Sequence, residues 1–413
     1  MSRYDALRAR ALDLFRAGVE AADPSHSVVR SLREAPLPAP GPGGRVSVVA
    51  FGKAAPLMAR AALSVIDADE TLIVTVDGLA VDLPGADVHF ASHPVPDKRG
   101  EAAAREVLRR AQALGPQDRL LALVSGGASA LLPAPVEGVS LADKIAVNRL
   151  LLASGAEIGE TNLVRQSLSR LKGGGLARAA APAGILSLIL SDVVEGDLGI
   201  VASGPTAAPL GSEADAAALL RRFGLWEKVP DTVRRHLERA HPPRSLPPVD
   251  NRLIGSNALS LAAMARACAG AKQVAEPLVG DVSDAAETVL AHWPQPGGAV
   301  LFGGETTVRI AGDGLGGRNQ ELSLRVAALA RARGLPGDFV FLSGGTDGRD
   351  GPTDAAGGLV DGATLSRMRE AGVDPTEALA RNDSYHALKA SGDLILMPPT
   401  GTNVADLQVL LRL

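Results

Sequence analysis

Four glycine-rich segments carry the residue types that bind anions. Three follow aliphatic runs directly and contain a Gly-Gly pair, at residues 125–130, 302–307 and 343–348, and the fourth is 172–175. Glycine lets backbone N–H groups approach an anion closely, and a following helix N-terminus adds a favourable dipole. A strand-to-helix turn needs glycine in any case, so one such segment would say little. The repeated pattern favours a phosphate-rich ligand.

Two cations lie among these glycines. Lys53 directly follows the aliphatic run 46–51, and Arg318 stands where a helix should begin. A helix N-terminus is an unfavourable place for positive charge, so both positions favour an anionic ligand. Lysine neutralises phosphate as a point charge, whereas the arginine fork binds carboxylate or phosphate through two hydrogen bonds. The structural alternatives are a solvated lysine and a surface arginine paired with Glu321 or a neighbouring helix.

Acidic residues follow several of the same runs. Asp192 comes after the run 185–190, Glu305 lies in the second Gly-Gly segment, and Asp347 and Asp354 follow the third. Carboxylates beside phosphate loops suit Mg²⁺, which takes one or two carboxylates together with phosphate oxygens. Aspartate is also an ordinary turn residue, so a purely local role is the alternative for each.

Most established nucleotide-binding and catalytic sequence motifs are absent or incomplete in this chain. A Walker A loop is absent, because Ala54 stands where Ser or Thr should follow Lys53. Residues 312–317 match G-x-G-x-x-G, but Asp338 begins the next expected strand instead of ending it, so the dinucleotide signal is weak. His93 lies in a proline-rich turn, where packing and acid–base chemistry are both open. The spacing shows neither a Ser-His-Asp set nor a His-rich metal cluster.

Short aliphatic runs alternate with helical patterns along the whole chain. Strands are expected at 46–51, 72–76, 120–124, 185–190, 252–254, 299–302, 339–342 and 393–397. Helices are expected at 54–66, 100–114, 141–157, 258–269 and 320–333. This alternation predicts an α/β protein with mostly parallel sheets covered on both faces. The proline-rich stretch 241–248 predicts a linker that divides the chain into domains 1–245 and 246–413; a long surface loop is the alternative.

The composition limits the class of protein. The 413 residues carry 42 Lys+Arg against 46 Asp+Glu, and 46% are hydrophobic, which excludes a disordered chain and disfavours a nucleic-acid-binding surface. Cys268 is the only cysteine, so an intramolecular disulfide cannot form. The first 20 residues predict an amphipathic helix instead of a signal peptide. No apolar run is long enough to span a membrane, and a cytoplasmic protein is the default expectation.

Taken together, the motifs resemble the glycerate 2-kinase family, whose relatives are often labelled hydroxypyruvate reductases. The N-terminal half carries FGKA (51–54), SHPVPD (92–97), SGGASAL (125–131), RLKGG (170–174), SDV (191–193) and ASGPT (202–206). The C-terminal half, which resembles the leucine-rich MOFRL module, carries GGETT (303–307), GRNQE (317–321), GGTDG (344–348), NDSY (382–385) and TGTNVAD (400–406). One departure is Val194-Glu195-Gly196-Asp197, where the family pattern has glycine directly after the valine.

The resemblance implies both a fold and a reaction. The fold would be α/β: a larger Rossmann-like domain with a mostly parallel sheet, a smaller α/β domain, and an active-site cleft between them. The reaction would move the γ-phosphoryl of ATP to the 2-hydroxyl of D-glycerate, giving 2-phosphoglycerate and ADP. Lys53 and Arg318 match the family's active-site pair. ATP and Mg²⁺ would be the cofactors and small molecules the partners, with no nucleic acid or membrane.

On this interpretation the remaining site residues receive roles. Asp192 is the first choice for the base that takes the hydroxyl proton, or for a Mg²⁺ ligand, with Asp347 and Asp354 behind it as ligands. Substrate or phosphate would be bound by two backbone segments and two side chains: Ser125, Gly126, Gly127, Ala128, Ser129, Gly344, Gly345, Thr346, Glu305 and Asn319.

Two rival functions stay open. A nicotinamide-dependent hydroxypyruvate reductase has the family label and residues 312–317 in its favour, but lacks the cofactor fingerprint and a histidine–acid pair. A non-catalytic regulator that binds a sugar acid or nucleotide is disfavoured by the charges kept among the glycines. The sequence does not determine the oligomeric state, for which a homodimer is one option, nor does it exclude a larger hydroxy acid as substrate.

Overall fold

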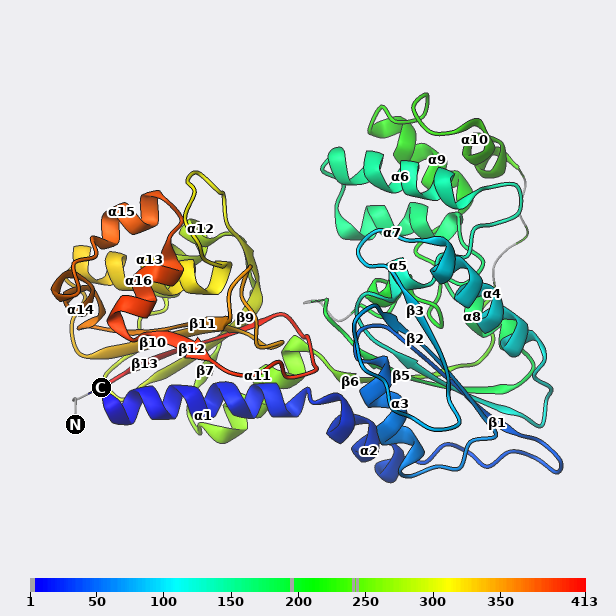
Figure 1. The fold of residues 1–413 in the computed structure, drawn as a ribbon, viewed down its shortest axis with the longest axis horizontal. Helices are drawn as coiled ribbons and strands as arrows, with labels where there is room; N and C mark the ends of the chain where they lie inside the picture. Colours follow the sequence, from blue (N-terminus) through cyan, green and yellow to red (C-terminus); the bar gives the residue numbers. More distant parts are fainter. Residues whose placement is uncertain (1–3, 194–196, 240–241, 243–244) are drawn as a thin grey trace. The chain divides into compact units, whose positions relative to one another are not determined.

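The computed structural model describes residues 4–193, 197–239, 242 and 245–413, and the chain divides into two compact units. The N-terminal unit spans Pro24–Ser191 and Gly196–Ile254. The C-terminal unit spans Gly255–Leu413 together with Met1–Asp23 and Asp192–Glu195. Each unit has its own sheet and its own hydrophobic core (Figure 1).

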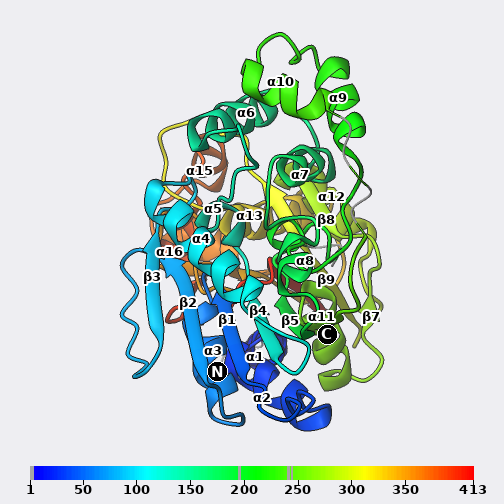
Figure 2. The same ribbon diagram turned by 90° about the vertical axis from the view of Figure 1, so that its right-hand side faces the viewer.

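The N-terminal unit is built on a sheet with the strand order β3-β2-β1-β4-β5-β6, and Figure 2 shows β3, β2, β1, β4 and β5 side by side. These five strands pair in parallel. The strands are β1 (Val46–Phe51), β2 (Glu70–Val76), β3 (Asp87–Ala91), β4 (Arg119–Val124), β5 (Gly184–Leu190) and β6 (Asp250–Gly255). This is the strand order of a Rossmann fold, which confirms the expected Rossmann-like sheet.

Helices cover this sheet because its central strands are apolar on both faces. Helix α3 packs on β1 and β2, and α4 packs on β3 and against α8. A separate helical region, made of α6, α7, α9 and α10, has its own apolar core. The helices are α2 (Pro24–Glu34), α3 (Ala55–Leu63), α4 (Lys98–Gln112), α5 (Ala128–Leu131), α6 (Leu141–Ala153), α7 (Ile158–Ser167), α8 (Gly175–Ala180), α9 (Glu213–Arg222) and α10 (Asp231–Glu238), with a 3₁₀ turn at Val201–Ser203.

The C-terminal unit has a mixed sheet in the order β12-β11-β10-β13-β9-β7, with β8 paired to β9. Its strands are β7 (Lys272–Gln273), β8 (Leu278–Asp281), β9 (Ala299–Thr307), β10 (Phe339–Gly345), β11 (Ala355–Asp361), β12 (Leu394–Leu396) and β13 (Asp406–Arg412). The expectation of mostly parallel sheets is wrong here, since β13 lies antiparallel between β9 and β10. The alternation of strands and helices could not show that the last strand inserts at the centre of the sheet.

Both faces of this second sheet are covered, and alternate residues point to opposite faces. Phe302 of β9 and Phe341 of β10 pack against α12 (Val282–Ala291), α13 (Arg318–Ala332) and their neighbours. Leu301 and Leu342 pack on the other face with α1 (Asp5–Ala21) and α11 (Asn257–Ala267). Figure 1 shows α1 running along the sheet. The remaining helices are α14 (Thr364–Glu370), α15 (Pro375–Ala380) and α16 (Ser384–Ser391).

The two units do not follow the expected division at residue 245. Helix α1 belongs with the C-terminal unit, because its Leu14 and Phe15 complete the core beneath β10 and β13. Residues 246–254 stay with the N-terminal unit, because β6 extends its sheet beside β5. Three residues of the expected linker, 241, 243 and 244, lie outside the described residues, as do residue 240 and Val194, Glu195 and Gly196 of the departing motif. Among the described helices, none is long and apolar enough to cross a membrane.

A buried ion-pair network ties α1 to the C-terminal unit. Arg8 Nη1 lies 2.7 Å from Asp361 Oδ2 and 2.8 Å from Asp393 Oδ1. Arg367 pairs with the same two carboxylates, which are each 1% exposed. Two buried negative charges are therefore balanced by two arginines from distant parts of the chain.

Removing Arg8 should destabilise the C-terminal unit more than the loss of an exposed surface arginine would. In Arg8→Ala, Arg367 alone would face two buried carboxylates, so we expect a loss of about 2–4 kcal/mol in the free energy of unfolding. Arg16→Ala is the matched control on the same helix, because Arg16 is 68% exposed and pairs only with exposed Asp13. That control should change stability by about 0.5 kcal/mol or less. Urea unfolding measures both, and equal losses would contradict the network.

Candidate active site

The first group of predicted site residues lies where the strand order of the N-terminal sheet reverses. Strand β1 has β2 on one side and β4 on the other. The chain after β1 continues to β2 on one side of the sheet, whereas the chain after β4 continues to β5 on the other side. Gly52 and Lys53 follow β1, and Ser125 to Gly127 follow β4. In open α/β sheets this reversal creates a crevice outside the carboxyl ends of the strands, and ligands bind there.

Close backbone contacts hold these two segments together. Ser125 N donates to Phe51 O at 3.0 Å, and Lys53 N donates to Gly126 O at 2.9 Å. Ala54 N donates to Ser125 Oγ at 3.1 Å. Gly52 has a φ of +122°, and a Cβ there would lie 2.2 Å from Ser125 Oγ, so only glycine fits. These contacts fix the backbone of Lys53, and therefore the position of its Cβ, at the end of β1.

Lys53, Gly127 and His93 converge at the turn before α5. A Cβ on Gly127 would meet Lys53 Cγ at 3.2 Å and His93 Cδ2 at 3.3 Å, and Gly127 also has a φ of +84°. Burial and the charge of Lys53 lower the pKa of His93. The imidazole is therefore mostly neutral near pH 7, and it lies beside a lysine expected to bind an anion.

Beyond α5, a polar chain runs into the interior. Lys172 Nζ donates to Ser129 O and Ser129 Oγ, both at 3.0 Å. Ser129 Oγ lies 2.8 Å from Ser203 Oγ, which in turn donates to Asn162 Oδ1 at 2.8 Å. Ser203 has a φ of +59°, and Ala202 before it has a φ of +52°, so two consecutive non-glycine residues adopt the left-handed region.

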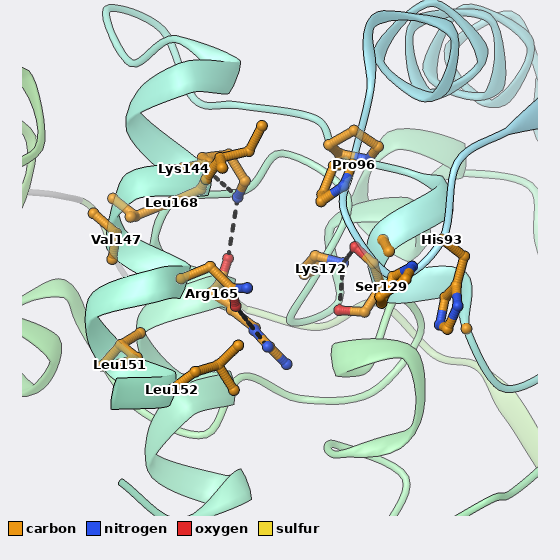
Figure 3. A pocket seen from close by; sticks show the side chains of 16 residues that line it. His93, Pro96, Ser129, Lys144, Val147, Leu151, Leu152, Arg165, Leu168 and Lys172 are labelled. Carbon is orange, nitrogen blue, oxygen red and sulfur yellow. Dashed lines mark hydrogen bonds between the residues drawn. The ribbon is translucent and has the colours of Figure 1, made fainter. Parts of the chain in front are cut away.

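A cavity of about 380 Å³ opens beside this chain; we call it the Lys172 cavity (Figure 3). Lys172, Lys144 and Arg165 line it together with Ser129 and His93. Its other wall comes from α6, which contributes Ile145, Val147, Leu151 and Leu152 as well as Lys144 and Asn148. No local sequence signal distinguishes a buried lysine from a solvated one, so none of these three cations was predicted as a site residue, although Lys172 begins the glycine-rich segment 172–175.

Burial shifts the charge state of the cavity lysines. It lowers the pKa of Lys172 well below its ordinary value, and the nearby charges of Lys144 and Arg165 lower it further. Burial, together with the charge of Arg165, lowers the pKa of Lys144 to about 7. Lys144 Nζ donates to Leu168 O at 2.8 Å, so its partner is a neutral oxygen.

Arg318, in the C-terminal unit, is held by two carboxylates. Its Nε lies 2.6 Å from Asp406 Oδ2 and its Nη2 lies 3.0 Å from Asp406 Oδ1, while its Nη1 lies 3.0 Å from Glu305 Oε1. Burial lowers the pKa of Arg318, but the hydrogen bond to Asp406 outweighs it and keeps the guanidinium charged. The alternative partner Glu321 is instead engaged by Arg325 and Asn382.

A second buried acid organises the start of α13. Asp350, which is 2% exposed, accepts from Asn319 N at 3.1 Å and from Gln320 N at 2.9 Å. Burial raises the pKa of Asp350 to about 6, against the effect of these hydrogen bonds. Gly317 is required because a Cβ there would lie 2.2 Å from Asp350 Cγ. The side chain of Asn319 is buried, and it accepts from Ser343 Oγ at 2.6 Å.

Residues 344–346 are used by the sheet. Gly344 pairs with Leu407 and Gly345 with Asp406 in the ladder to β13. Thr346 N donates to Ala405 O at 3.1 Å, and Thr346 Oγ1 donates to the same oxygen at 2.6 Å. A Cβ on Gly344 would lie 2.8 Å from Phe15 Cζ. Packing against α1 and β13 therefore accounts for this Gly-Gly pair, and its phosphate-binding role stays a prediction without further support.

The three aspartates predicted as metal ligands are placed in different surroundings. Asp347 Oδ1 accepts from Arg349 N at 2.9 Å, and Asp354 Oδ1 accepts from Tyr385 Oη at 2.8 Å. Asp192 lies just after β5. Within the described part of the chain, no group of three or more His, Cys, Asp or Glu side chains could hold a metal ion.

Comparison with known proteins identifies the family. A family model described as a domain of unknown function, DUF4147, matches residues 10–238, and the MOFRL family model matches residues 298–406. A glycerate 2-kinase from Pyrococcus horikoshii is 39% identical over 98% of this chain and 97% of its own length. The chain belongs to the glycerate 2-kinase family. A second family member, a D-glycerate 2-kinase from Thermotoga maritima, is 37% identical over 98% of each chain.

The fold agrees with the same family. The crystal structure of a glycerate kinase from Thermotoga maritima matches with a TM-score of 0.90 and 36% identity, covering 99% of this chain and 100% of that one. The expected family resemblance and the α/β fold class are therefore confirmed. The contacts of Lys53 and Arg318 described above are those of a glycerate 2-kinase family member.

The Arg318–Asp406 pair predicts a pH-dependent loss of stability. Removing Arg318 would leave Asp406, which is 0% exposed, without its cation, and burial already raises the pKa of that carboxyl. A raised pKa in the folded state means that stability falls as pH rises above the ordinary aspartate range. We therefore expect Arg318→Ala to lose more stability at pH 8 than at pH 5 in urea unfolding. Arg331→Ala, exposed on the same helix, is the control, and a pH-independent loss in Arg318→Ala would refute this account.

Proposed function

We propose that this protein is a kinase that transfers the γ-phosphoryl group of ATP to the 2-hydroxyl of D-glycerate, giving 2-phosphoglycerate and ADP. The observation that carries the proposal is Lys53 lying against Gly127 where the strand order reverses, in a chain of the glycerate 2-kinase family. A cation and a glycine turn at that position are what a transferred phosphoryl group requires.

Phosphoryl transfer asks a protein for positioning and charge neutralisation more than for covalent chemistry. Lys53 would neutralise charge on the phosphoryl group, and the turn 125–129 would hold phosphate oxygens. Arg318 would bind substrate by exchanging the half-exposed Glu305 at Nη1 for a substrate oxygen, because Asp406 holds its Nε and Nη2. The buried pair fixes the direction of the fork before substrate arrives, so little ordering cost remains.

The proton of the 2-hydroxyl needs an acceptor as the new P–O bond forms. Asp192, directly after β5, is our first choice for that base or for a carboxylate that meets the Mg²⁺ of the ATP complex. Asp347 and Asp354 come behind it as metal ligands; Asp347 accepts from Arg349 N, and Asp354 accepts from Tyr385 Oη. Mg²⁺ bound mainly by phosphate oxygens needs only one or two protein carboxylates, so it enters here as part of the substrate.

The reductase alternative loses its main structural argument. The G-x-G-x-x-G segment packs against residues 381–383: Gly314 N donates to Arg381 O at 2.8 Å, and a Cβ on Gly312 would lie 2.5 Å from Arg381 Cα. These glycines are therefore needed for packing, without a dinucleotide. Two relatives from Agrobacterium vitis carry the hydroxypyruvate reductase name in provisional form, whereas the glycerate 2-kinase names of the Pyrococcus horikoshii and Thermotoga maritima relatives carry no such qualification.

A coupled assay tests the proposal directly. Purified protein with MgATP and D-glycerate is coupled through enolase, without phosphoglycerate mutase. We expect phosphoenolpyruvate to form at once, because enolase accepts only the 2-phosphorylated product. ADP without phosphoenolpyruvate would mean another position or another acceptor. Consumption of NADH or NADPH by hydroxypyruvate, with no ADP formed, would replace the kinase by the reductase.

Lys53→Ala should lower kcat/KM without unfolding the protein, because the side chain is exposed. Loss of one preorganised cation costs about 2–4 kcal/mol of transition-state stabilisation, or roughly 30- to 1,000-fold in rate. Lys98→Ala, also exposed in the N-terminal unit, is the matched control and should keep full activity. An unchanged kcat/KM in a folded Lys53→Ala variant would remove Lys53 from the site.

A further inference from the structure

The Lys172 cavity gathers the basic side chains of Lys172, Lys144 and Arg165. Lys172 is 4% exposed, and the cavity cations donate to neutral oxygens: Ser129 for Lys172, Leu168 for Lys144 and the side-chain amide of Asn148 for Arg165. None of the described residues that line the cavity is acidic. Buried cations without counter-charges are costly, so the arrangement favours a polyanionic ligand.

The opposite wall of the cavity is largely apolar, apart from Lys144 and Asn148. Helix α6 contributes Val147, Leu151 and Leu152, and Figure 3 shows these side chains on the side of the cavity away from Lys172 and Ser129. Leu152 is 65% exposed, so its side chain is accessible to a ligand that enters the cavity. A ligand that fits both walls has a flat apolar part and a polyanionic part.

We propose that the Lys172 cavity binds the donor nucleotide, with its polyphosphate against Lys172, Ser129 and Arg165 and its base against α6. This inference rests on the proposed kinase function. The volume of about 380 Å³ lies within the range of cavities that hold cofactor-sized ligands. D-Glycerate carries a polar group on every carbon, so it would leave the apolar wall of α6 without a partner.

The orientation follows from the turn before α5. Gly127 lines the cavity, and its backbone lies against the Lys53 side chain. A nucleotide whose base rests on α6 and whose phosphates pass Lys172 and Ser129 therefore presents its terminal phosphate toward Lys53. Donor binding and phosphoryl transfer then use neighbouring parts of the same unit.

A charge placed on the apolar wall tests the base position. Leu152→Asp should fold, because the side chain is exposed, but it should weaken ADP and adenosine binding about tenfold, equivalent to about 1.4 kcal/mol. The KM for ATP should rise by a similar factor while the KM for D-glycerate stays unchanged. Ile158→Asp is the matched control: Ile158 is 53% exposed, begins α7 and does not line the cavity. Calorimetry gives the binding constants without requiring turnover.

A second variant tests the polyphosphate position. Arg165→Gln keeps a hydrogen-bond donor near Asn148 but removes the charge, so it should weaken ADP binding and leave adenosine binding unchanged. If Leu152→Asp and Arg165→Gln raise the KM for D-glycerate and leave ADP binding intact, the cavity is the acceptor site and the inference is overturned. If the wild type turns over and both variants bind ADP as tightly as Ile158→Asp does, the cavity is not the nucleotide site. That result would overturn the inference and leave the kinase function intact. If the variants weaken ADP binding but the wild type phosphorylates nothing, the nucleotide site stands and the proposed kinase function fails.

Discussion

A wholly buried carboxylate, Asp406, is the constraint on which the C-terminal unit depends. It begins β13, the last strand, which lies between β9 and β10 at the centre of the sheet. A charge there is tolerable only with a partner of good geometry, and Arg318 supplies two hydrogen bonds to it. The same ion pair therefore links the central position of β13, the start of α13 at Arg318 and the direction in which the Arg318 guanidinium points.

The N-terminal unit buries cations instead of a carboxylate. Its buried cations are held by carbonyl, hydroxyl and amide oxygens, which accept hydrogen bonds but carry no charge. Burial, and then the nearby charges, lower the pKa of Lys172 and Lys144, and a polyanion at the same place would favour their charged forms. One unit thus holds an arginine already neutralised by acids, while the other keeps uncompensated positive charge beside its glycine turn.

Local patterns located several elements well. The run 46–51 is β1 to the residue, and Lys53 and Ser125 lie together because parallel neighbours end at the same edge. The Gly-Gly pairs were harder to interpret, because glycine can be required by anion binding, by a tight turn or by close packing, and the sequence does not distinguish these causes. Gly52 is required by the approach of Ser125, whereas Gly344 makes room for Phe15 from a helix more than 300 residues away in the chain.

Hydrophobic periodicity and motif composition were enough to determine the α/β class, the family resemblance and the two cations, because each depends on residues close together in the chain. Long-range pairing decided the rest. It placed β13 antiparallel between two parallel strands, moved α1 to the C-terminal unit, and joined Arg318 to Asp406 across 88 residues. It also gathered Lys144, Arg165 and Lys172 around one cavity. Burial and charge balance are properties of neighbours in space, and only the folded chain brings those neighbours together.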